Sequence, residues 1–335
     1  MFKVNGHTLV MSKAFSKLHM KIIYSFFRLI RYLNLLFIIL TQTLFYFCIV
    51  RPAYAKYGSQ TPELTINNLI LLVTASVLIA AAGYIINDYF DLNIDRLNKP
   101  SKIVIDRYIN RRWAMFFHSL FSFLGLVLTG VVALNIRNPL LLVANIFCVL
   151  LLWFYSTTFK KKFLTGNIII SLLTAWVVFV LFVAEVQWLS GDLLPSSNAA
   201  IIAIYKGAVL YSGFAFIVSL IREVVKDSED ELGDRKNGAK TMPIVWGMMP
   251  TKVFVSVWVI VLIWSLAAIM VYALMQQWIL IFIFIVFLLL KYLLGFISKL
   301  SKASSNNQYS AISRDLKWLM LFGILSMILY YYHLG

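Results

Sequence analysis

The chain alternates between long apolar segments and short polar ones. Nine apolar segments are close to the length of about 20 residues that an α-helix needs to cross a bilayer. They run roughly over 33–50, 66–87, 113–132, 139–156, 164–186, 203–222, 253–275, 277–297 and 316–333. So many apolar runs cannot all be buried in one soluble core, so lipid is the expected solvent. The pattern predicts an all-α polytopic membrane protein of about nine transmembrane helices around a central cavity open to the cytosolic side.

Two parts of this pattern refine the organisation. The connectors near 135–139 and 276–277 are very short, which predicts tight helical hairpins. Residues 1–30 form a basic, partly apolar extension before the nine-helix domain at 31–335. This extension is either an amphipathic helix on the membrane surface or a loosely ordered tail. It shows no cleavage site typical of a signal peptide.

The distribution of Lys and Arg predicts an orientation. With the N-terminus inside, the five inner segments hold six, six, three, six and five of these residues, which makes 26 of the 30. The outer segments hold the other four, Arg51, Lys56, Arg137 and Lys206. Cytoplasmic loops of membrane proteins collect positive charge. We therefore expect an integral protein of a bacterial or archaeal cytoplasmic membrane, with a cytosolic N-terminus.

Composition agrees with this interpretation. Hydrophobic residues make up 61% of the chain and charged residues only 13%. The net charge of +16 is scattered over loops and forms no known nucleic-acid module, so no nucleic-acid partner is expected. Cys48 and Cys148 lie inside apolar runs and are expected to be packing residues.

Acidic residues are concentrated in two inner loops. Ten of the fourteen lie there, and both loops contain the pattern Asp-x-x-Asp-x-x-x-Asp-Arg with a constant offset of 139 residues. The pattern consists of Asp88, Asp91, Asp95 and Arg96 in the first loop, and Asp227, Asp230, Asp234 and Arg235 in the second. Spacings of three and four place the three aspartates on one helical face.

Like charges placed in this way repel one another, so a cation is expected in front of each face. Mg²⁺ suits the site because it takes oxygen ligands and is commonly held by one or two carboxylates plus substrate phosphates. Two such faces would hold metal ions that bridge a diphosphate. Nearby cations are expected to bind phosphate oxygens directly. These are Arg96, Lys99, Lys226, Arg235 and Lys240.

The two motifs resemble those of a known family. The Asn-Asp-x-x-Asp-x-x-x-Asp stretch at 87–95 and the Asp-x-x-x-Asp stretch at 230–234 are similar to the signatures of the UbiA superfamily of intramembrane prenyltransferases. The resemblance implies nine helices with both motifs on the cytosolic side. It implies catalytic and Mg²⁺-binding roles, with Mn²⁺ as a substitute, for Asp91, Asp95, Asp230 and Asp234, and a metal-binding role for Asn87. Asp88 and Asp227 are further candidate metal ligands from the local pattern.

Other positions resemble this family more loosely. The Arg-x-x-Asn stretch at 31–34 suggests that Asn34 faces the active site, although a packing amide is the alternative. Tyr155, followed by Lys160, Lys161 and Asn167, resembles the family's Tyr…Lys…Asn stretch. Here the alternative is that lysines 160–162 are a positive-inside anchor.

The resemblance implies transfer of a prenyl group from its diphosphate to a lipophilic acceptor. The allylic cation must be shielded from water, and aromatic faces can stabilise it. Candidates near the inner helix ends are Tyr84, Tyr89, Phe90, Tyr155, Phe159 and Tyr211.

The identity of the acceptor depends on finer features of the second motif. The stretch at 222–243, including Arg222 and Lys226, resembles the branch that contains geranylgeranylglyceryl phosphate geranylgeranyltransferases, and a phosphorylated acceptor would suit the extra cations. An aromatic acceptor of quinone biosynthesis is the alternative within the family. A transporter or lipid-binding protein is the alternative outside it, but the acidic clusters lie at the membrane surface rather than at mid-membrane. Prenyl chain length and oligomeric state stay open.

Overall fold

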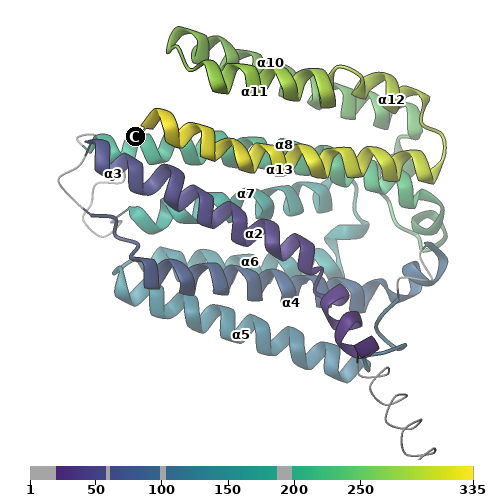
Figure 1. The fold of residues 1–335 in the computed structure, drawn as a ribbon. Coiled ribbons are helices and arrows are strands. Elements are labelled where there is room, and N and C mark those ends of the chain that lie inside the picture. The colour runs from purple at the N-terminus through teal and green to yellow at the C-terminus, as the bar shows by residue number, and fades with distance from the viewer. Residues whose placement is uncertain (1–19, 58–60, 99–102, 187–197, 335) are drawn as a thin grey trace, which may run out of the picture.

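The computed structural model describes residues 20–57, 61–98, 103–186 and 198–334, apart from the side chains of 93–95, 97–98 and 333–334. Within these ranges the chain is almost entirely helical (Figure 1). The α-helices are α2 (Tyr32–Phe45), α3 (Arg51–Tyr57), α4 (Ile66–Asn98), α5 (Arg111–Asn135), α6 (Pro139–Thr157), α7 (Thr165–Glu185), α8 (Ala199–Lys236), α9 (Met242–Val245), α10 (Met248–Met275), α11 (Ile279–Leu288), α12 (Phe296–Lys302) and α13 (Asn306–Leu334). They are joined in places by π-turns at Tyr46–Val50 and Leu289–Leu293, and by the 3₁₀ turn η3 at Phe159–Lys161.

The predicted all-α membrane architecture is confirmed, and each predicted apolar segment lies within or almost wholly within these helices. Over the described ranges, eight helical stretches are long and apolar enough to cross a membrane. The remaining segment belongs to α13, which has 29 residues and sufficient length. Asp315 and Lys317 near its start and tyrosines near its end dilute its apolar character. The count of nine spans therefore stays a prediction.

Both aspartate motifs lie in helices, whereas the sequence predicted loops. Helix α4 has 33 residues and α8 has 38, so they are about 50 and 57 Å long and extend well beyond a hydrocarbon core of about 30 Å. Ion pairs one turn apart support the polar end of α8, such as Arg235 with Glu231 at 2.5 Å. The helix stops where Gly238 takes a φ of +70°. The helical extension keeps each acidic face continuous with a membrane span.

The first span contains an irregularity that the sequence explains. A π-turn at Tyr46–Val50 separates α2 from α3, and Pro52 follows directly. Proline lacks the amide hydrogen that would continue the α-helical ladder, and its ring would collide with the carbonyl four residues earlier. The wider turn accommodates this residue, so the helical span continues to Tyr57 rather than stopping near residue 50.

Helix α8 occupies the middle of the bundle. It packs against α7 on one side and α13 on the other, while the α10–α12 hairpin forms an outer layer and α4–α6 the opposite one (Figure 1). Its buried residues contribute to two apolar clusters. One includes Phe45, Ile49 and Ile204, and the other includes Val218 and Leu316. The second acidic motif therefore stands on the best-supported helix of the fold.

The described part of the N-terminal extension packs onto the bundle. Residues 20–29 are helical, Leu29 is fully buried, and the Phe26 ring meets the Phe117 ring of α5 at 5.2 Å. Met20 and Tyr24 on the other face are exposed. Residues 20–29 are therefore a helix that packs on the bundle, and its location on the membrane surface stays a prediction; residues 1–19 lie outside the described ranges.

Buried polar side chains within the spans satisfy one another across helices. The Asn145 amide donates to the Thr129 hydroxyl at 3.0 Å, and the Trp176 indole donates to the Asn145 carbonyl at 2.9 Å. These bonds join α5, α6 and α7. In hydrocarbon no water can replace such partners, so these bonds fix the relative positions of the three helices.

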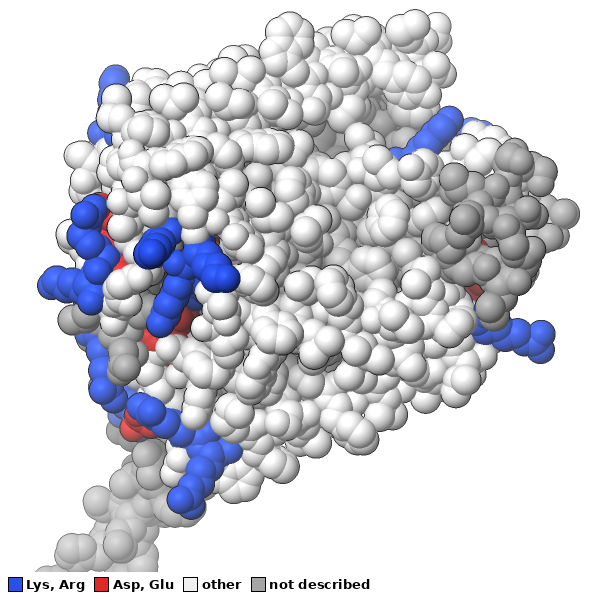
Figure 2. Space-filling model, turned by 180° about the vertical axis from the view of Figure 1, so that it is seen from behind, with Lys and Arg blue, Asp and Glu red and all other residues white. Residues whose placement is uncertain are grey.

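Charged side chains gather at the ends of the bundle. Figure 2 shows most visible Lys and Arg at one end, with Asp and Glu among them, and a broad uncharged belt between the ends. The basic end is the one that carries the motif-bearing termini of α4 and α8. Opposite ends of very different charge are expected from the uneven distribution of Lys and Arg.

A close helix contact gives a test of this packing. A Cβ atom added at Gly125 in α5 would lie 2.7 Å from Ile79 Cγ1 and 3.2 Å from the Ala75 carbonyl oxygen of α4. We expect Gly125→Ala to lower the unfolding free energy by about 1–3 kcal/mol, because the helices must separate. Thermal unfolding in detergent would measure this. Gly130→Ala, whose Cβ meets nothing closer than 3.9 Å, is the matched control, and equal stability of both variants would contradict the packing.

Candidate active site

The first acidic face lies at the polar end of α4. Asn87 and Asp91 are one turn apart and nearly buried, with 8% and 5% of their surface exposed. The Asn87 amide donates to Asp91 Oδ2 at 2.8 Å. This bond fixes the carboxylate in one orientation, which a metal-binding or phosphate-facing carboxylate needs.

Lys160 approaches the same carboxylate from another part of the chain. Its ammonium group forms an ion pair with Asp91 and lies 3.4 Å from Asn87 Oδ1. Burial lowers the pKa of Lys160, but the Asp91 carboxylate beside it outweighs burial, and the net pKa lies above the ordinary value of lysine. Lys160 is therefore charged at neutral pH and balances the negative charge of the first face.

The turn that carries Lys160 is folded tightly against α7. Lys160 lies in η3, and the chain then passes through Leu164, which adopts a left-handed φ of 55°. A Cβ at Gly166 would come within 3.0 Å of both the Lys160 Cα and the Phe159 carbonyl, and within 3.3 Å of the Tyr155 ring. Only glycine permits this approach, so Gly166 helps to place Lys160 against α4.

The second acidic face lies on α8, which contacts α4. The Asn167 amide of α7 donates to Asp227 Oδ2 at 2.8 Å. Asp234 is buried with 8% exposure, and Asp230 is half-buried. Lys160 lies within electrostatic range of Asp227 as well as Asp91. The Lys160 charge therefore acts on residues of both motifs, whose helices α4 and α8 are in contact.

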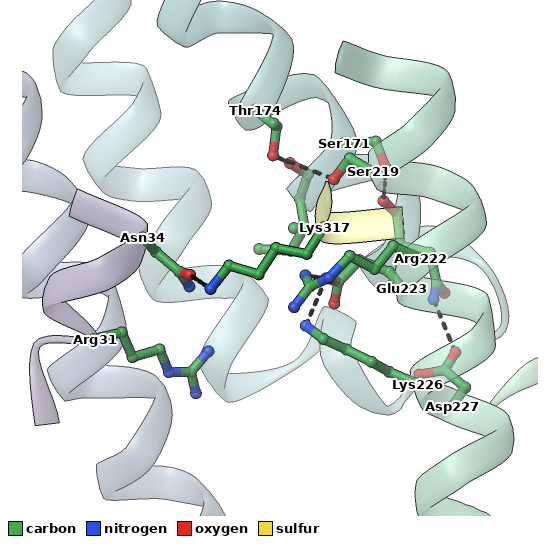
Figure 3. A network of polar contacts seen from close by, with 12 residues as sticks. Arg31, Asn34, Ser171, Thr174, Ser219, Arg222, Glu223, Lys226, Asp227 and Lys317 are labelled. Carbon is green, nitrogen blue, oxygen red and sulfur yellow. Dashed lines mark hydrogen bonds and ion pairs between the residues drawn. The ribbon is translucent and has the colours of Figure 1, made fainter. Parts of the chain in front are cut away.

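A group of cations lies beside the two faces (Figure 3). Arg222 and Lys226 share the Glu223 carboxylate, at 3.1 and 2.6 Å. Arg31, just before α2, pairs with Asp88 at 2.8 Å. The Lys317 ammonium of α13 donates to Asn34 Oδ1 at 2.9 Å. The site thus draws side chains from the beginning, middle and end of the chain.

Several predicted site residues lie elsewhere. Arg96 pairs with Asp106 at 3.5 Å, and Arg235 pairs with Glu231, so both arginines are engaged at the surface. Lys161 and Lys240 are exposed, and only their backbones meet, through a 2.8 Å bond from the Lys240 amide to the Lys161 carbonyl. The Asp95 side chain and the whole of Lys99 lie outside the described parts.

Two of the aromatic candidates lie beside the site, and a third lies in the apolar core. The Tyr84 ring lies under the Arg31 guanidinium at 4.9 Å, and Tyr155 borders the Lys160 turn. Tyr211 is buried in the apolar core, where its hydroxyl lies 3.1 Å from the Ser326 hydroxyl. Packing rather than contact with substrate explains Tyr211.

A family model agrees with these motifs and with the helical architecture. The model of the UbiA prenyltransferase family matches residues 44–322, which is most of the chain. This chain belongs to the UbiA prenyltransferase family. Its long apolar helices and its family identify it as an integral membrane protein.

Individual relatives of this UbiA chain are archaeal. It is 34% identical over 185 residues to a protein of Sulfurisphaera tokodaii, and 31% identical over 198 residues to one of Methanococcoides burtonii. Both relatives are named digeranylgeranylglyceryl phosphate synthase. The matched stretches cover 55% and 58% of this chain and 59% and 63% of the relatives, which is less than two thirds of their length.

Solved structures share the fold. One, from work on digeranylgeranylglyceryl phosphate synthase in membranes, superposes with a TM-score of 0.63 at 24% identity and covers 93% of this chain and 99% of its own. A UbiA homolog from Archaeoglobus fulgidus, bound to DMAPP and Mg²⁺, superposes with a TM-score of 0.55 at 16% identity. That alignment covers 91% of this chain and 99% of the homolog.

The structure adds three residues to the site of this UbiA chain that the sequence did not single out. Lys160 rather than its neighbour Lys161 contacts the first face, Asn167 contacts the second, and Lys317 reaches Asn34. Lys160 and Asn167 lay within the resembling stretch, and a positive-inside anchor was the alternative for lysines 160–162. Lys317 had one available signal, since it is a cation inside the last apolar segment at 316–333.

The donor groups suit a hard divalent cation. Each face presents carboxylate and amide oxygens, which Mg²⁺ prefers. Within the described side chains, no three acidic, His or Cys groups come close enough to hold an ion by themselves.

The Lys160–Asp91 pair can be tested without any substrate. We expect Lys160→Met to lower the unfolding free energy by about 3 kcal/mol, because it leaves a buried carboxylate without its cation. Adding Asp91→Asn should restore most of the loss. Thermal unfolding in detergent completes the double-mutant cycle, with Lys161→Met as the control at an exposed neighbour. Additive losses in the double variant would show that the two residues are not coupled.

Proposed function

We propose that this protein is a Mg²⁺-dependent prenyltransferase that transfers a geranylgeranyl group from its diphosphate to geranylgeranylglyceryl phosphate. The observation that carries the proposal is the position of two acidic faces at one end of the bundle, with Lys160 paired to the first face and within electrostatic range of the second. Oxygen ligands beside fixed cations form the arrangement that a metal-bound diphosphate needs. Family membership and the names of the archaeal relatives support the same function.

The two motifs divide the binding of the donor. Asn87, Asp91 and Asp95 would hold metal at the first face, and Asp230 and Asp234 at the second. When bound, Mg²⁺ supplies positive charge that stabilises the departing diphosphate. Mn²⁺ also prefers oxygen ligands and would substitute. The A. fulgidus homolog bound to DMAPP and Mg²⁺ supports this assignment.

The reaction exchanges one carbon–oxygen bond for another. The bond from C1 of the prenyl group to the diphosphate oxygen breaks, and both electrons leave with the diphosphate. The acceptor hydroxyl oxygen then bonds to C1, and its proton passes to the released diphosphate or to water. Lys160 and Arg31 hold positive charge beside the leaving group, and the Tyr84 and Tyr155 rings border the region where the allylic cation forms.

The distribution of charge supports a cytosolic site, and the archaeal relatives support an archaeal membrane. The motif-bearing ends of α4 and α8 lie at the end that Figure 2 shows to be rich in Lys and Arg. Because positive charge collects on the cytoplasmic side, the donor diphosphate would enter from the cytosol. Its apolar tail and the lipid acceptor would lie among the helices or in the surrounding lipid.

A transfer assay tests the acceptor. Purified protein with Mg²⁺ and labelled geranylgeranyl diphosphate should form a lipid product with geranylgeranylglyceryl phosphate, and none with 4-hydroxybenzoate or dihydroxynaphthoate. Extraction and chromatography of the label would measure each product. Product from an aromatic acid alone would instead place the protein in quinone biosynthesis and refute the proposed acceptor.

The metal assignment predicts the effect of single substitutions. Asp91→Ala, Asp95→Ala, Asp230→Ala and Asp234→Ala should each lower turnover by at least about a hundredfold, because each removes a ligand from a charge-stabilising centre. EDTA should abolish transfer, and Mg²⁺ should restore it. Asp315→Asn is the control, since Asp315 pairs with Lys299 at 3.0 Å away from both motifs. Near-normal turnover in any two of the four variants would refute the assignment.

A further inference from the structure

A polar cluster with three cations lies beside the acidic faces and joins α8 to α2 and α13, which carry neither motif. It consists of Arg222 and Lys226 on α8, Lys317 on α13 and Asn34 on α2. Figure 3 shows the Lys317 side chain directed at Asn34, with Arg222 and Lys226 extending into the same region. Helix α13 carries neither motif, so Lys317 brings a charge that the two aspartate faces do not require.

Lys317 has no acidic partner among the side chains that the structure describes. Its ammonium donates to the neutral Asn34 carbonyl at 2.9 Å and lies 5.4 Å from the Phe37 ring centre. Among the described side chains, no carboxylate forms an ion pair with Lys317. It is also within electrostatic range of Arg222 and Arg31, which carry the same charge. A cation held beside other cations near hydrocarbon is costly unless an anion joins it.

The α8 cations leave a further positive charge. Arg222 and Lys226 both pair with the single carboxylate of Glu223, at 3.1 and 2.6 Å. The Arg222 Nε atom is buried and has no hydrogen-bond partner. With Lys317, the cluster therefore holds three cations and one anion, a surplus of two positive charges. A buried donor without a protein partner is unusual, and an ordered water or a ligand would supply the missing partner.

We propose that Lys317, with Arg222 and Lys226, binds the phosphate of the acceptor and selects a phosphorylated lipid over an uncharged or aromatic one. The inference rests on the proposed function. A phosphate monoester carries about −1.5 to −2 charges at neutral pH, which matches the surplus in the cluster. An aromatic carboxylate carries one charge, and a lipid alcohol carries none.

The arrangement separates two phosphate sites. The donor diphosphate belongs with the metal at Asn87, Asp91 and the α8 aspartates, next to Lys160. The acceptor phosphate belongs on the α13 side, where Lys317 and Asn34 meet. Arg31 is held by Asp88 and lies within electrostatic range of Lys317, at the boundary between the two sites.

The test compares Lys317→Met with Lys317→Arg in the full-length protein. Steady-state kinetics would use geranylgeranylglyceryl phosphate and the same lipid without its phosphate, with geranylgeranyl diphosphate as donor. In Lys317→Met, KM for the phosphorylated acceptor should rise about tenfold or more, because a charged hydrogen bond is lost. KM for the donor and kcat/KM for the unphosphorylated lipid should stay unchanged. Lys317→Arg should retain most of the wild-type preference.

Two controls keep the result specific. Lys291→Met removes a lysine that lies over the Phe287 and Tyr292 rings at the same end of the bundle, and it should not change the KM for the acceptor. sn-Glycerol 1-phosphate, used as an inhibitor, should compete with the acceptor in the wild type and lose potency in Lys317→Met. Thermal unfolding and gel filtration of each variant would exclude misfolding as the cause of a changed KM.

The outcomes separate this inference from the proposed function. If Lys317→Met raises the KM of donor and acceptor equally, the charge serves the diphosphate and the inference is overturned. If it lowers kcat alike with both lipids, Lys317 only positions the helices, which also overturns it. An unchanged KM for the acceptor refutes the phosphate site while the wild-type reaction stands. Wild-type protein that uses only an aromatic acid refutes the proposed function and this inference together.

Discussion

Every carboxylate that is withdrawn from water at the end of this bundle must be balanced, and that constraint organises the site. Asp91 is nearly buried, and its charge is compensated by Lys160 from the turn between α6 and α7. Asp88 is compensated by Arg31, which precedes α2. Removing one partner from such a pair leaves an uncompensated charge and costs far more than removing both. The elements that supply these cations, the residues before α2 and the turn between α6 and α7, therefore have to contact α4.

The same pairing prepares the site for a charged substrate. In the proposed function Asp91 would hold a divalent ion, and the Lys160 ammonium that now pairs with Asp91 would then be available to phosphate oxygens. The positive charge is already in place and costs little reorganisation when negative charge develops on a leaving group. On the second face, Asp227 receives an amide hydrogen bond from Asn167. The two faces thus share the spacing of their aspartates but hold Asp91 and Asp227 by different contacts, an ion pair in the first and an amide hydrogen bond in the second.

Local patterns in the sequence predicted the long helices and the two acidic faces. Several side chains of the site depend on long-range contacts that no local pattern predicts. Runs of apolar residues marked every long helix, and the repeated aspartate spacing located both acidic faces. The choice between Lys160 and Lys161 depends on how a short turn folds back on Gly166, which no spacing encodes. The bond between Lys317 and Asn34 joins residues 283 positions apart, so it appears only when α13 is placed beside α2. The motif-bearing stretches predicted as loops are helical, and on α8 an ion pair one turn apart stabilises the polar end.

The arginine that ends each copy of the repeated motif does not have the role that the sequence predicted. Arg96 and Arg235 hold the same position in the two motifs, and both were predicted to bind phosphate. Each instead reaches a surface carboxylate, Asp106 or Glu231. In an α-helix, side chains three or four residues apart lie on the same face. Consecutive side chains point about 100° apart around the helix axis. An arginine directly following the last aspartate of the motif is therefore directed off the acidic face in both copies. The cations that face the site are Arg222 and Lys226 on α8, and Arg31, Lys160 and Lys317 on other elements. Their positions relative to the motifs did not identify them, whereas their contacts in the fold do.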